Sequence, residues 1–110
     1  MNRQELMDLL ADYPVIPAIK NEAGLRRCLE SDNPLVFVLH ATLNTVSALV
    51  DTMKAQHKTV FIHMDLIDGL SQREEAVDFL AKNTRADGII STKPNLIRHA
   101  SSLGLLTVQR

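Results

Sequence analysis

The chain turns from apolar to polar within one short stretch, Val60-Phe61-Ile62-His63-Met64-Asp65. The same change occurs where residues 88–91 lead into 92–95, and where residues 105–108 lead into 109–110. Apolar strands whose polar residues collect at their carboxyl ends are typical of parallel α/β proteins, which bind ligands at that edge. Successive strands in such sheets are usually neighbours, so we expect the three ends to lie side by side. The sequence therefore predicts a ligand site on one rim of a sheet.

Hydrophobic periodicity divides the chain into alternating strands and helices. Short apolar runs predict the strands, and apolar residues at three- and four-residue spacing predict the helices. The expected strands cover residues 15–19, 35–39, 59–65, 88–91 and 105–108. The expected helices cover residues 3–11, the segment around 25–29, and the segments 46–53, 71–80 and 94–103.

Several of these helices carry end signals in the sequence. Ser71 and Glu74 fit a capping box, in which each side chain satisfies an amide of the other residue. Thr42 or Asn44 is the candidate cap of the helix over 46–53. Pro94 falls at the first position of the last helix, which tolerates a missing amide hydrogen.

The order of these elements predicts the fold class, which is α/β with parallel (βα) repeats and right-handed crossovers. We expect one partial (β/α) barrel domain over residues 1–110, TIM-barrel-like but incomplete, with about five strands. An open, doubly wound five-stranded sheet is the alternative. The chain ends on an apolar strand with no helix to cover it, which suggests a chain cut short.

Composition limits the class of protein. The 110 residues are 45% hydrophobic and 23% charged, which is typical of one soluble globular domain. The net charge of -1 argues against a large non-specific nucleic-acid footprint. Cys28 is the single cysteine, and no apolar run approaches the length of a membrane helix. We therefore expect a cytoplasmic protein without membrane association.

Two titratable side chains follow each other on one face of the strand over 59–65. Side chains alternate along a strand, so His63 and Asp65 share a face and point inward near the mouth of a barrel. His63 is either a ligand-site residue or a core histidine bonded to a neighbour. Asp65 favours a site role, because a carboxylate is expensive to bury without a partner or ligand.

The junctions after the next two strands predict an anion site. Thr92, Lys93 and Asn95 surround a helix start, where free amides and the helix dipole attract negative charge. The alternative is a capped helix with a solvated lysine. Arg110 suits bidentate contact with phosphate or carboxylate, and Gln109 stands beside it. A terminal arginine can also simply fray.

Other polar positions give weaker signals. Residues 20–22 belong either to the same rim or to an ordinary turn. His40 ends the second strand and is equally a candidate for the rim, the core or the surface, and residues 57–58 are expected to face solvent. The histidines and Cys28 show no metal-ligand spacing, so no metal site is predicted. There is no phosphate-cradling glycine loop, nucleophile elbow or aromatic stacking pair.

Several motifs together resemble one protein family. Residues 62–70, IHMDLIDGL, and residues 86–97, ADGIISTKPNLI, look like hallmarks of the glycerol-3-phosphate-responsive antiterminators. Residues 16–19 and 106–110 resemble the first and fifth strands of that family. The resemblance runs from about Pro14 to the last residue.

The resemblance implies a fold and a function. Members resemble TIM barrels, bind glycerol 3-phosphate and act on the leader mRNA of a glycerol-utilisation operon, so that transcription passes a terminator. They are regulators and not known enzymes, so no cofactor besides the effector and no catalytic residue is expected. Asp65 would accept hydrogen bonds from glycerol hydroxyls, and Lys93 would favour an anion. The ligand-binding residues that the resemblance implies are His63, Asp65, Thr92, Lys93, Asn95, Gln109 and Arg110.

The chain departs from the family in length, because family chains continue through three more βα units. TIM barrels frequently bind phosphate with loops after their last two strands. A truncated product, a fragment or a swapped homo-oligomer of partial barrels would each account for the difference.

Two other functions remain open at this point. A barrel-type lyase or aldolase on a small phosphorylated substrate would use Lys93 as Schiff-base nucleophile and Asp65 as proton shuttle. A receiver-like phosphoacceptor domain would use Asp65 and Thr92, but it lacks the acid pair after the first strand that holds Mg²⁺.

Overall fold

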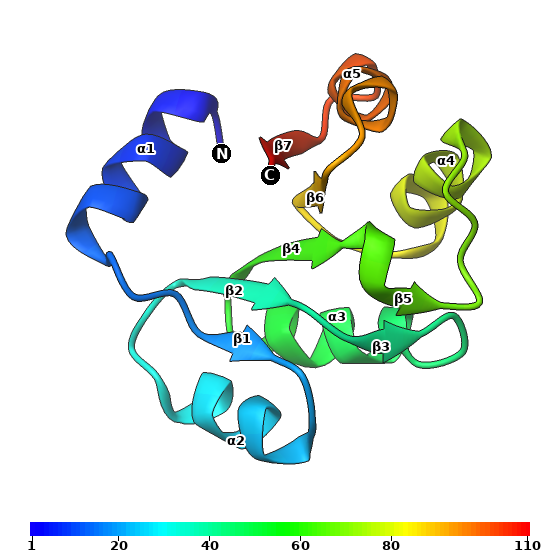
Figure 1. Ribbon diagram of the computed structural model, residues 1–110. Coiled ribbons are helices and arrows are strands. Elements are labelled where there is room, and N and C mark those ends of the chain that lie inside the picture. Colours follow the sequence, from blue (N-terminus) through cyan, green and yellow to red (C-terminus); the bar gives the residue numbers. More distant parts are fainter.

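The computed structural model describes all residues, 1–110, and its main feature is a five-stranded parallel sheet flanked by helices (Figure 1). The sheet comprises β1 (Ala18–Ile19), β2 (Leu35–Val38), β4 (Thr59–His63), β6 (Gly88–Ser91) and β7 (Leu106–Gln109). The helices are α1 (Arg3–Asp12), α2 (Glu22–Glu30), α3 (Val46–Ala55), α4 (Glu74–Asn83) and α5 (Pro94–Ser102). The predicted alternation of strands and helices is confirmed.

A small second sheet, which the sequence did not predict, lies beyond the ends of β2 and β4. It pairs β3 (Ala41–Thr42) in parallel with β5 (Ile67–Asp68). A 3-10 turn, η1 (Met64–Leu66), separates β4 from β5. The expected strand over 59–65 therefore ends at His63, and Asp65 lies in the turn that follows it.

The strand order of the main sheet is β1-β2-β4-β6-β7, with every pair parallel. This order follows the sequence without a reversal, as the strands of a (β/α) barrel do. A doubly wound sheet reverses its order at a switch point, so the topology favours the barrel interpretation. The same strand order disfavours the receiver-domain alternative, because that fold has such a reversal.

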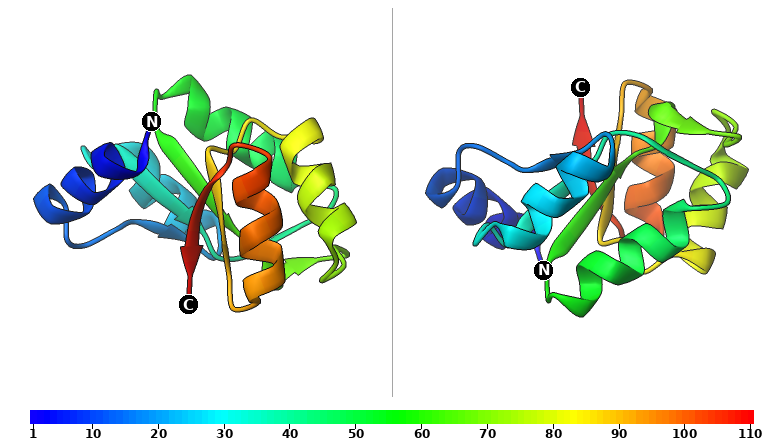
Figure 2. Two further views of the ribbon diagram at one scale, coloured as in Figure 1. Left: turned by 90° about the horizontal axis from the view of Figure 1, so that it is seen from above. Right: turned by 90° about the horizontal axis from the view of Figure 1, so that it is seen from below.

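The three central strands, β2, β4 and β6, are largely buried on both faces, as their unbroken apolar runs predict, whereas β7 at the edge is only partly buried. One face packs against α2 to α5 and forms a core of 18 buried residues, among them Val36, Ile62 and Ile89. The opposite face carries a smaller cluster of Leu35, Phe61 and Ile90, to which α1 contributes Leu6. Figures 1 and 2 show α3, α4 and α5 together on one side of the sheet and α1 on the other.

Gly88 makes room for the aromatic layer on this second face. Phe61 stands beside Phe37, with ring centroids 5.6 Å apart. A Cβ atom at Gly88 would lie 2.6 Å from Cε2 of Phe61 and 2.5 Å from the carbonyl oxygen of Leu106. The absence of a side chain at residue 88 therefore allows the Phe61 ring to pack closely against the backbone of β6.

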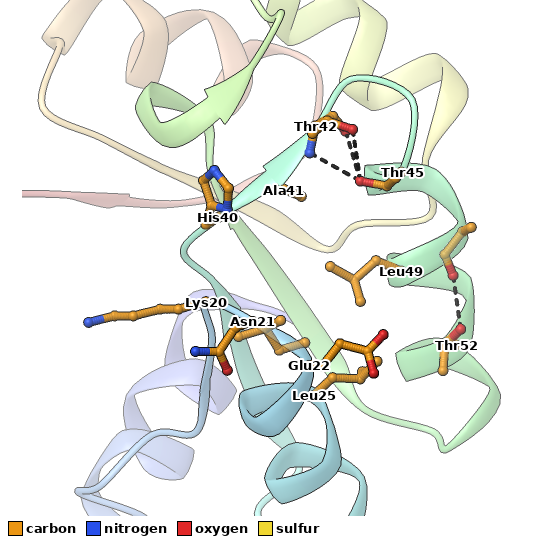
Figure 3. A pocket seen from close by; sticks show the side chains of 12 residues that line it. Lys20, Asn21, Glu22, Leu25, His40, Ala41, Thr42, Thr45, Leu49 and Thr52 are labelled. Atoms are coloured by element: carbon orange, nitrogen blue, oxygen red, sulfur yellow. Dashed lines mark hydrogen bonds between the residues drawn. The ribbon is translucent and has the colours of Figure 1, made fainter.

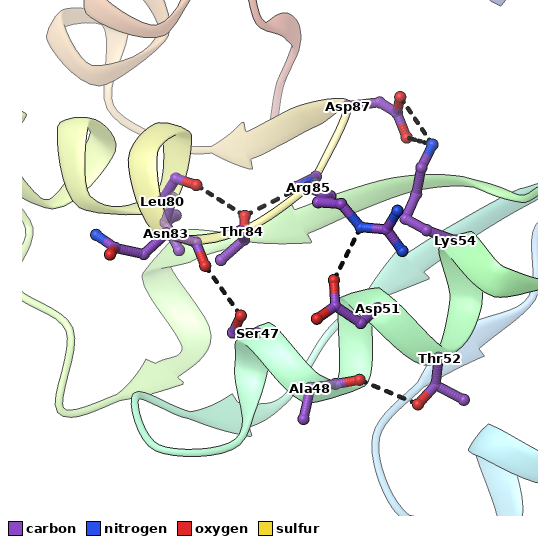
Figure 4. Close-up of polar contacts among 11 residues, drawn as sticks. Ser47, Ala48, Asp51, Thr52, Lys54, Leu80, Asn83, Thr84, Arg85 and Asp87 are labelled. Atoms are coloured by element: carbon purple, nitrogen blue, oxygen red, sulfur yellow. Dashed lines mark hydrogen bonds and ion pairs between the residues drawn. The ribbon is translucent and has the colours of Figure 1, made fainter.

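The amino-terminal edge of the sheet is tied together by Asp87 (Figure 4). Its carboxylate accepts hydrogen bonds from Nζ of Lys54 at 2.8 and 3.1 Å and from the amide of Val60 at 2.8 Å. The nearby pair of Arg85 and Asp51, at 3.0 Å, is much more exposed. Asp87 thus joins α3, β4 and the loop before β6.

Several local expectations are corrected by the structure. Thr45, rather than Thr42 or Asn44, is the residue that precedes α3. Arg73 occupies that position before α4, so the proposed capping box of Ser71 and Glu74 does not form.

Lys58, expected to face solvent, is instead 6% exposed. Its Nζ donates to the carbonyl oxygens of Ser31 at 2.8 Å and Asn33 at 2.9 Å. The hydrogen bonds explain the burial, because a lysine can enter a core only when its ammonium protons find acceptors.

Candidate functional site

Asp65 joins the end of β4 to the junction between β6 and α5. Its Oδ1 accepts a hydrogen bond from Oγ of Ser91 at 2.7 Å. Its Oδ2 accepts from the amide of Thr92 at 2.9 Å and from Oγ1 of Thr92 at 2.8 Å. The ends of β4 and β6 therefore lie together on one rim, as the sequence predicted. The Asp65 carboxylate, however, already accepts three hydrogen bonds from groups of the protein itself.

These hydrogen bonds determine the ionisation of Asp65. Burial raises the pKa of the Asp65 carboxyl, but the hydrogen bonds from the Thr92 amide, Ser91 and Thr92 outweigh it, with a small contribution from His63. The pKa therefore lies below its ordinary value, and Asp65 is a carboxylate at neutral pH.

His63 is a buried residue of the same rim, only 2% exposed. Its Nε2 lies 3.1 Å from Nη1 of Arg110. A guanidinium can only donate, so Nε2 accepts and the ring proton is on Nδ1. That Nδ1 has no hydrogen-bond partner in the structure.

The surroundings keep the His63 ring neutral. Burial lowers the pKa of His63, Asp65 raises it, Arg110 lowers it again, and the backbone of His63 raises it slightly. The net shift is downward, which agrees with a ring that accepts a hydrogen bond from a cation. The two interpretations of His63 therefore combine: it is a buried histidine, and its partner is the predicted site residue Arg110.

Lys93 is the N-cap residue of α5, and its side chain is held in place. Its Nζ donates to Oε1 of Gln72 at 2.7 Å. Gln72 lies in the loop between β5 and α4 and was not singled out from the sequence. A neutral glutamine in a loop carries no sequence signal that would point to a lysine elsewhere in the chain.

The helix start offers fewer free amides than the sequence suggested. The amides of Thr92 and Lys93 donate to Asp65 and Ser91, and that of Leu96 donates to the Lys93 carbonyl. Pro94 has no amide hydrogen. An anion at this junction would therefore depend chiefly on the Lys93 ammonium, with the dipole of α5 as a smaller contribution.

Two cations of the rim have no carboxylate partner. The four ion pairs of the structure involve other residues, so no carboxylate lies within 4.0 Å of Lys93 or Arg110. Each of the two instead meets a neutral group, Gln72 or His63. Their charge is thus available to an anion.

The other two predicted residues make no side-chain hydrogen bond with Asp65 or Lys93, although Gln109 lies opposite Ser91 in the register of β6 and β7. Asn95 is exposed on α5, and its side chain makes no hydrogen bond. Gln109 lines a groove of about 400 Å³ beside α1, together with Arg3, Met7 and Thr107.

A separate cavity of about 360 Å³ lies between α2 and α3 (Figure 3). Its lining includes residues 20–22 and His40, the polar positions that gave weaker signals in the sequence. His40 pairs with Asp68 at 3.0 Å, and Lys20 extends away from Leu49. Asp65, Ser91, Thr92 and Lys93 do not line this cavity.

No group of three or more His, Cys, Asp or Glu side chains is arranged to hold a metal ion. None of the helices combines the length and apolar character that crossing a membrane requires.

Comparison with known proteins gives consistent matches. The family model described as "Glycerol-3-phosphate responsive antiterminator" matches residues 15–110. The uncharacterized protein YgcP of Escherichia coli (strain K12) is 38% identical over 105 residues, which are 96% of this chain and 55% of that protein.

Two solved structures are similar in fold and sequence. A glycerol uptake operon antiterminator regulatory protein from Listeria monocytogenes str. 4b F2365 has a TM-score of 0.82 and 37% identity, over 86% of this chain and 51% of that one. A glycerol uptake operon antiterminator-related protein from Thermotoga maritima MSB8 has a TM-score of 0.76 and 32% identity, over 86% of this chain and 53% of that one. The chain thus spans about half the length of the relatives it matches.

Proposed function

Because the chain belongs to the glycerol-3-phosphate responsive antiterminator family, we propose that it acts as an effector-controlled regulator of transcription. In this proposal it binds glycerol 3-phosphate at the rim formed by β4, β6 and β7. It also binds the leader mRNA of a glycerol-utilisation operon and allows readthrough of a terminator. Its target would place its action in the cytoplasm.

The observation that supports an anionic effector is the pair of unneutralised cations on the rim. Lys93 and Arg110 follow neighbouring strands and have no carboxylate partner. Such cations bind phosphate through charge-assisted hydrogen bonds.

The proposal assigns Asp65 a different role from the one first expected. Its two oxygens already accept three hydrogen bonds from Ser91 and Thr92, so contact with glycerol hydroxyls would compete with these. We assign Asp65 to positioning the Thr92–Lys93 segment. Thr92 is correspondingly a positioning residue through its bonds to Asp65.

A thermal melt tests the effector. Glycerol 3-phosphate should raise the melting temperature, whereas glycerol and inorganic phosphate at equal concentration should raise it less, because selective binding to the folded state stabilises it. Lys93→Met should abolish the shift. Lys82→Met, which removes the same charge from the exposed face of α4, should retain it. A melt indifferent to glycerol 3-phosphate would contradict this part of the proposal.

Binding to leader RNA is a separate test. We expect glycerol 3-phosphate to strengthen binding of the chain to the leader transcript, and the affinity to fall steeply with salt. A transcript with the terminator stem reversed is the control. Sedimentation of the complex would show whether one copy or a homo-oligomer binds.

The aldolase alternative has less support from the structure. A Schiff-base lysine must be neutral and desolvated, whereas Lys93 is half-buried and donates to Gln72. Borohydride trapping with a small aldehyde phosphate tests it directly. A covalent adduct at Lys93 would overturn the regulator proposal.

A further inference from the structure

Gln72 reaches Lys93 from a different part of the fold, and we infer that it is a positioning residue that sets the anion affinity of the rim. It orients the ammonium of Lys93 without cancelling its charge. The inference rests on the proposed function, since it concerns the same site.

The contact between the two side chains is well defined. Oε1 of Gln72 accepts from Nζ of Lys93 at 2.7 Å, and both residues are half-buried. Gln72 and Asp65 both lie in the segment 64–73, which connects β4 to α4. Asp65 accepts a hydrogen bond from the backbone amide of Thr92, next to Lys93. The segment 64–73 therefore holds both the backbone next to Lys93 and the Lys93 side chain.

The chemistry of the acceptor explains why a glutamine suits this position. A lysine ammonium has three protons, of which Gln72 takes one, so two remain for a ligand. A neutral amide oxygen holds the ammonium but leaves its positive charge intact. A glutamate here would form an ion pair and compete with any anion that approached.

The hydrogen bond to Gln72 also restricts the conformational freedom of the Lys93 side chain. A free lysine loses rotamer freedom when it binds a ligand, and this loss weakens binding. Lys93 has already lost that freedom on folding, because its ammonium is hydrogen-bonded. Removing the acceptor should therefore weaken anion binding even where the charge of Lys93 is retained.

Two substitutions of Gln72 separate the two effects. Gln72→Glu keeps the size of the side chain and adds a charge, whereas Gln72→Met removes the acceptor and stays neutral. Gln56→Glu adds the same charge at an exposed position after α3, next to the opposite edge of the sheet, and is the matched control. Circular dichroism melts establish that each variant folds.

Calorimetric titration with glycerol 3-phosphate and with inorganic phosphate gives the affinity. We expect Gln72→Glu to weaken binding of both by about tenfold or more, and Gln72→Met by a smaller factor. Gln56→Glu should stay within about twofold of the parent chain. Raising the salt concentration should shrink the loss caused by Gln72→Glu, because salt screens the added charge, and should leave the smaller loss caused by Gln72→Met nearly unchanged.

NMR of the Lys93 side chain tests the contact without any ligand. Gln72→Glu and Gln72→Met should each shift the Cε and Hε resonances of Lys93, because the acceptor of its ammonium changes, and Gln56→Glu should leave them in place. Lys93 resonances that stay in place in both Gln72 variants would overturn the inference. So would an unchanged anion affinity in both variants.

The same experiments distinguish failure of the inference from failure of the proposed function. If the parent chain binds neither glycerol 3-phosphate nor inorganic phosphate, the proposed function is contradicted, and Gln72 has no anion affinity to set. A parent chain that binds glycerol 3-phosphate as tightly as Gln72→Glu does supports the proposed function and overturns the inference alone.

Discussion

The carboxylate of Asp65 accepts a hydrogen bond from the backbone amide of Thr92 across 2.9 Å. With the hydroxyls of Ser91 and Thr92 it forms a cross-link between the turn after β4 and the start of α5. Asp65 therefore stabilises the structure of the rim. The two cations of the rim, Lys93 and Arg110, have no carboxylate partner.

Asp65→Asn should destabilise the fold in a pH-dependent way. At neutral pH we expect the free energy of unfolding to fall by about 1–3 kcal/mol, because an amide replaces a carboxylate that accepts three hydrogen bonds. The pKa of Asp65 is lowered in the folded state, so its contribution is complete above about pH 4 and is lost as the pH falls through the folded pKa. Urea unfolding of both chains should show the difference shrinking below about pH 4. A difference that stays constant in acid would contradict this assignment.

His63 should make stability depend on pH in a higher range. Its pKa is lowered on folding, so the unfolded chain binds the proton more readily and stability is lost as the pH falls below about 6.5. His63→Gln keeps an acceptor for Arg110 but cannot titrate. Between about pH 6.5 and 5 the parent chain should therefore lose more stability than the variant. His57→Asn, in an exposed turn, is the control and should follow the parent chain.

Gly88→Ala should destabilise the sheet by about 1–3 kcal/mol or more through overpacking. The new methyl group would meet both Phe61 and the Leu106 carbonyl at less than 3 Å. Adding Phe61→Leu should recover only part of the loss, because the clash with the carbonyl remains. Full stability of Gly88→Ala in urea unfolding would show that the strands can separate at no cost.

Asp87→Asn and Asp51→Asn should differ although both remove an aspartate charge. Asp87 is 27% exposed and binds Lys54 and the Val60 amide, so its loss should cost about 1–3 kcal/mol. Asp51 is 55% exposed in its pair with Arg85, and the loss should stay near or below about 0.5 kcal/mol. Thermal melts of both variants measure the two losses. Equal losses of stability would show that the burial of the aspartate does not determine its contribution.

The sequence predicted those features that depend on local pattern. The apolar runs gave the strands, and the spacing of residues such as Val77 and Leu80 gave the buried face of α4. The motifs over 62–70 and 86–97 indicated the family, and the matching family model confirms it. The polar strand ends were predicted to lie side by side, and the contacts of Asp65 with Thr92 confirm this for the ends of β4 and β6.

Other features depend on contacts between distant residues and carried no local signal. Gln72 and Lys93 are 21 residues apart, and Arg110 is 47 residues from His63. The short β3–β5 pair was missed because two-residue strands have no periodicity to detect. Lys58 is buried because loop carbonyls face it, although a charged residue in a turn favours exposure.

By itself, the sequence determined that the chain forms parallel βα units and that its polar strand ends share one rim, because strand length, side-chain alternation and crossover handedness are properties of the local chain. Only the tertiary structure decided which of those polar groups is free. Asp65 is occupied by three donors, while Lys93 and Arg110 meet neutral partners and keep their charge. Whether a polar group is satisfied depends on what lies within about 3 Å of it, and that is fixed only when distant segments pack together.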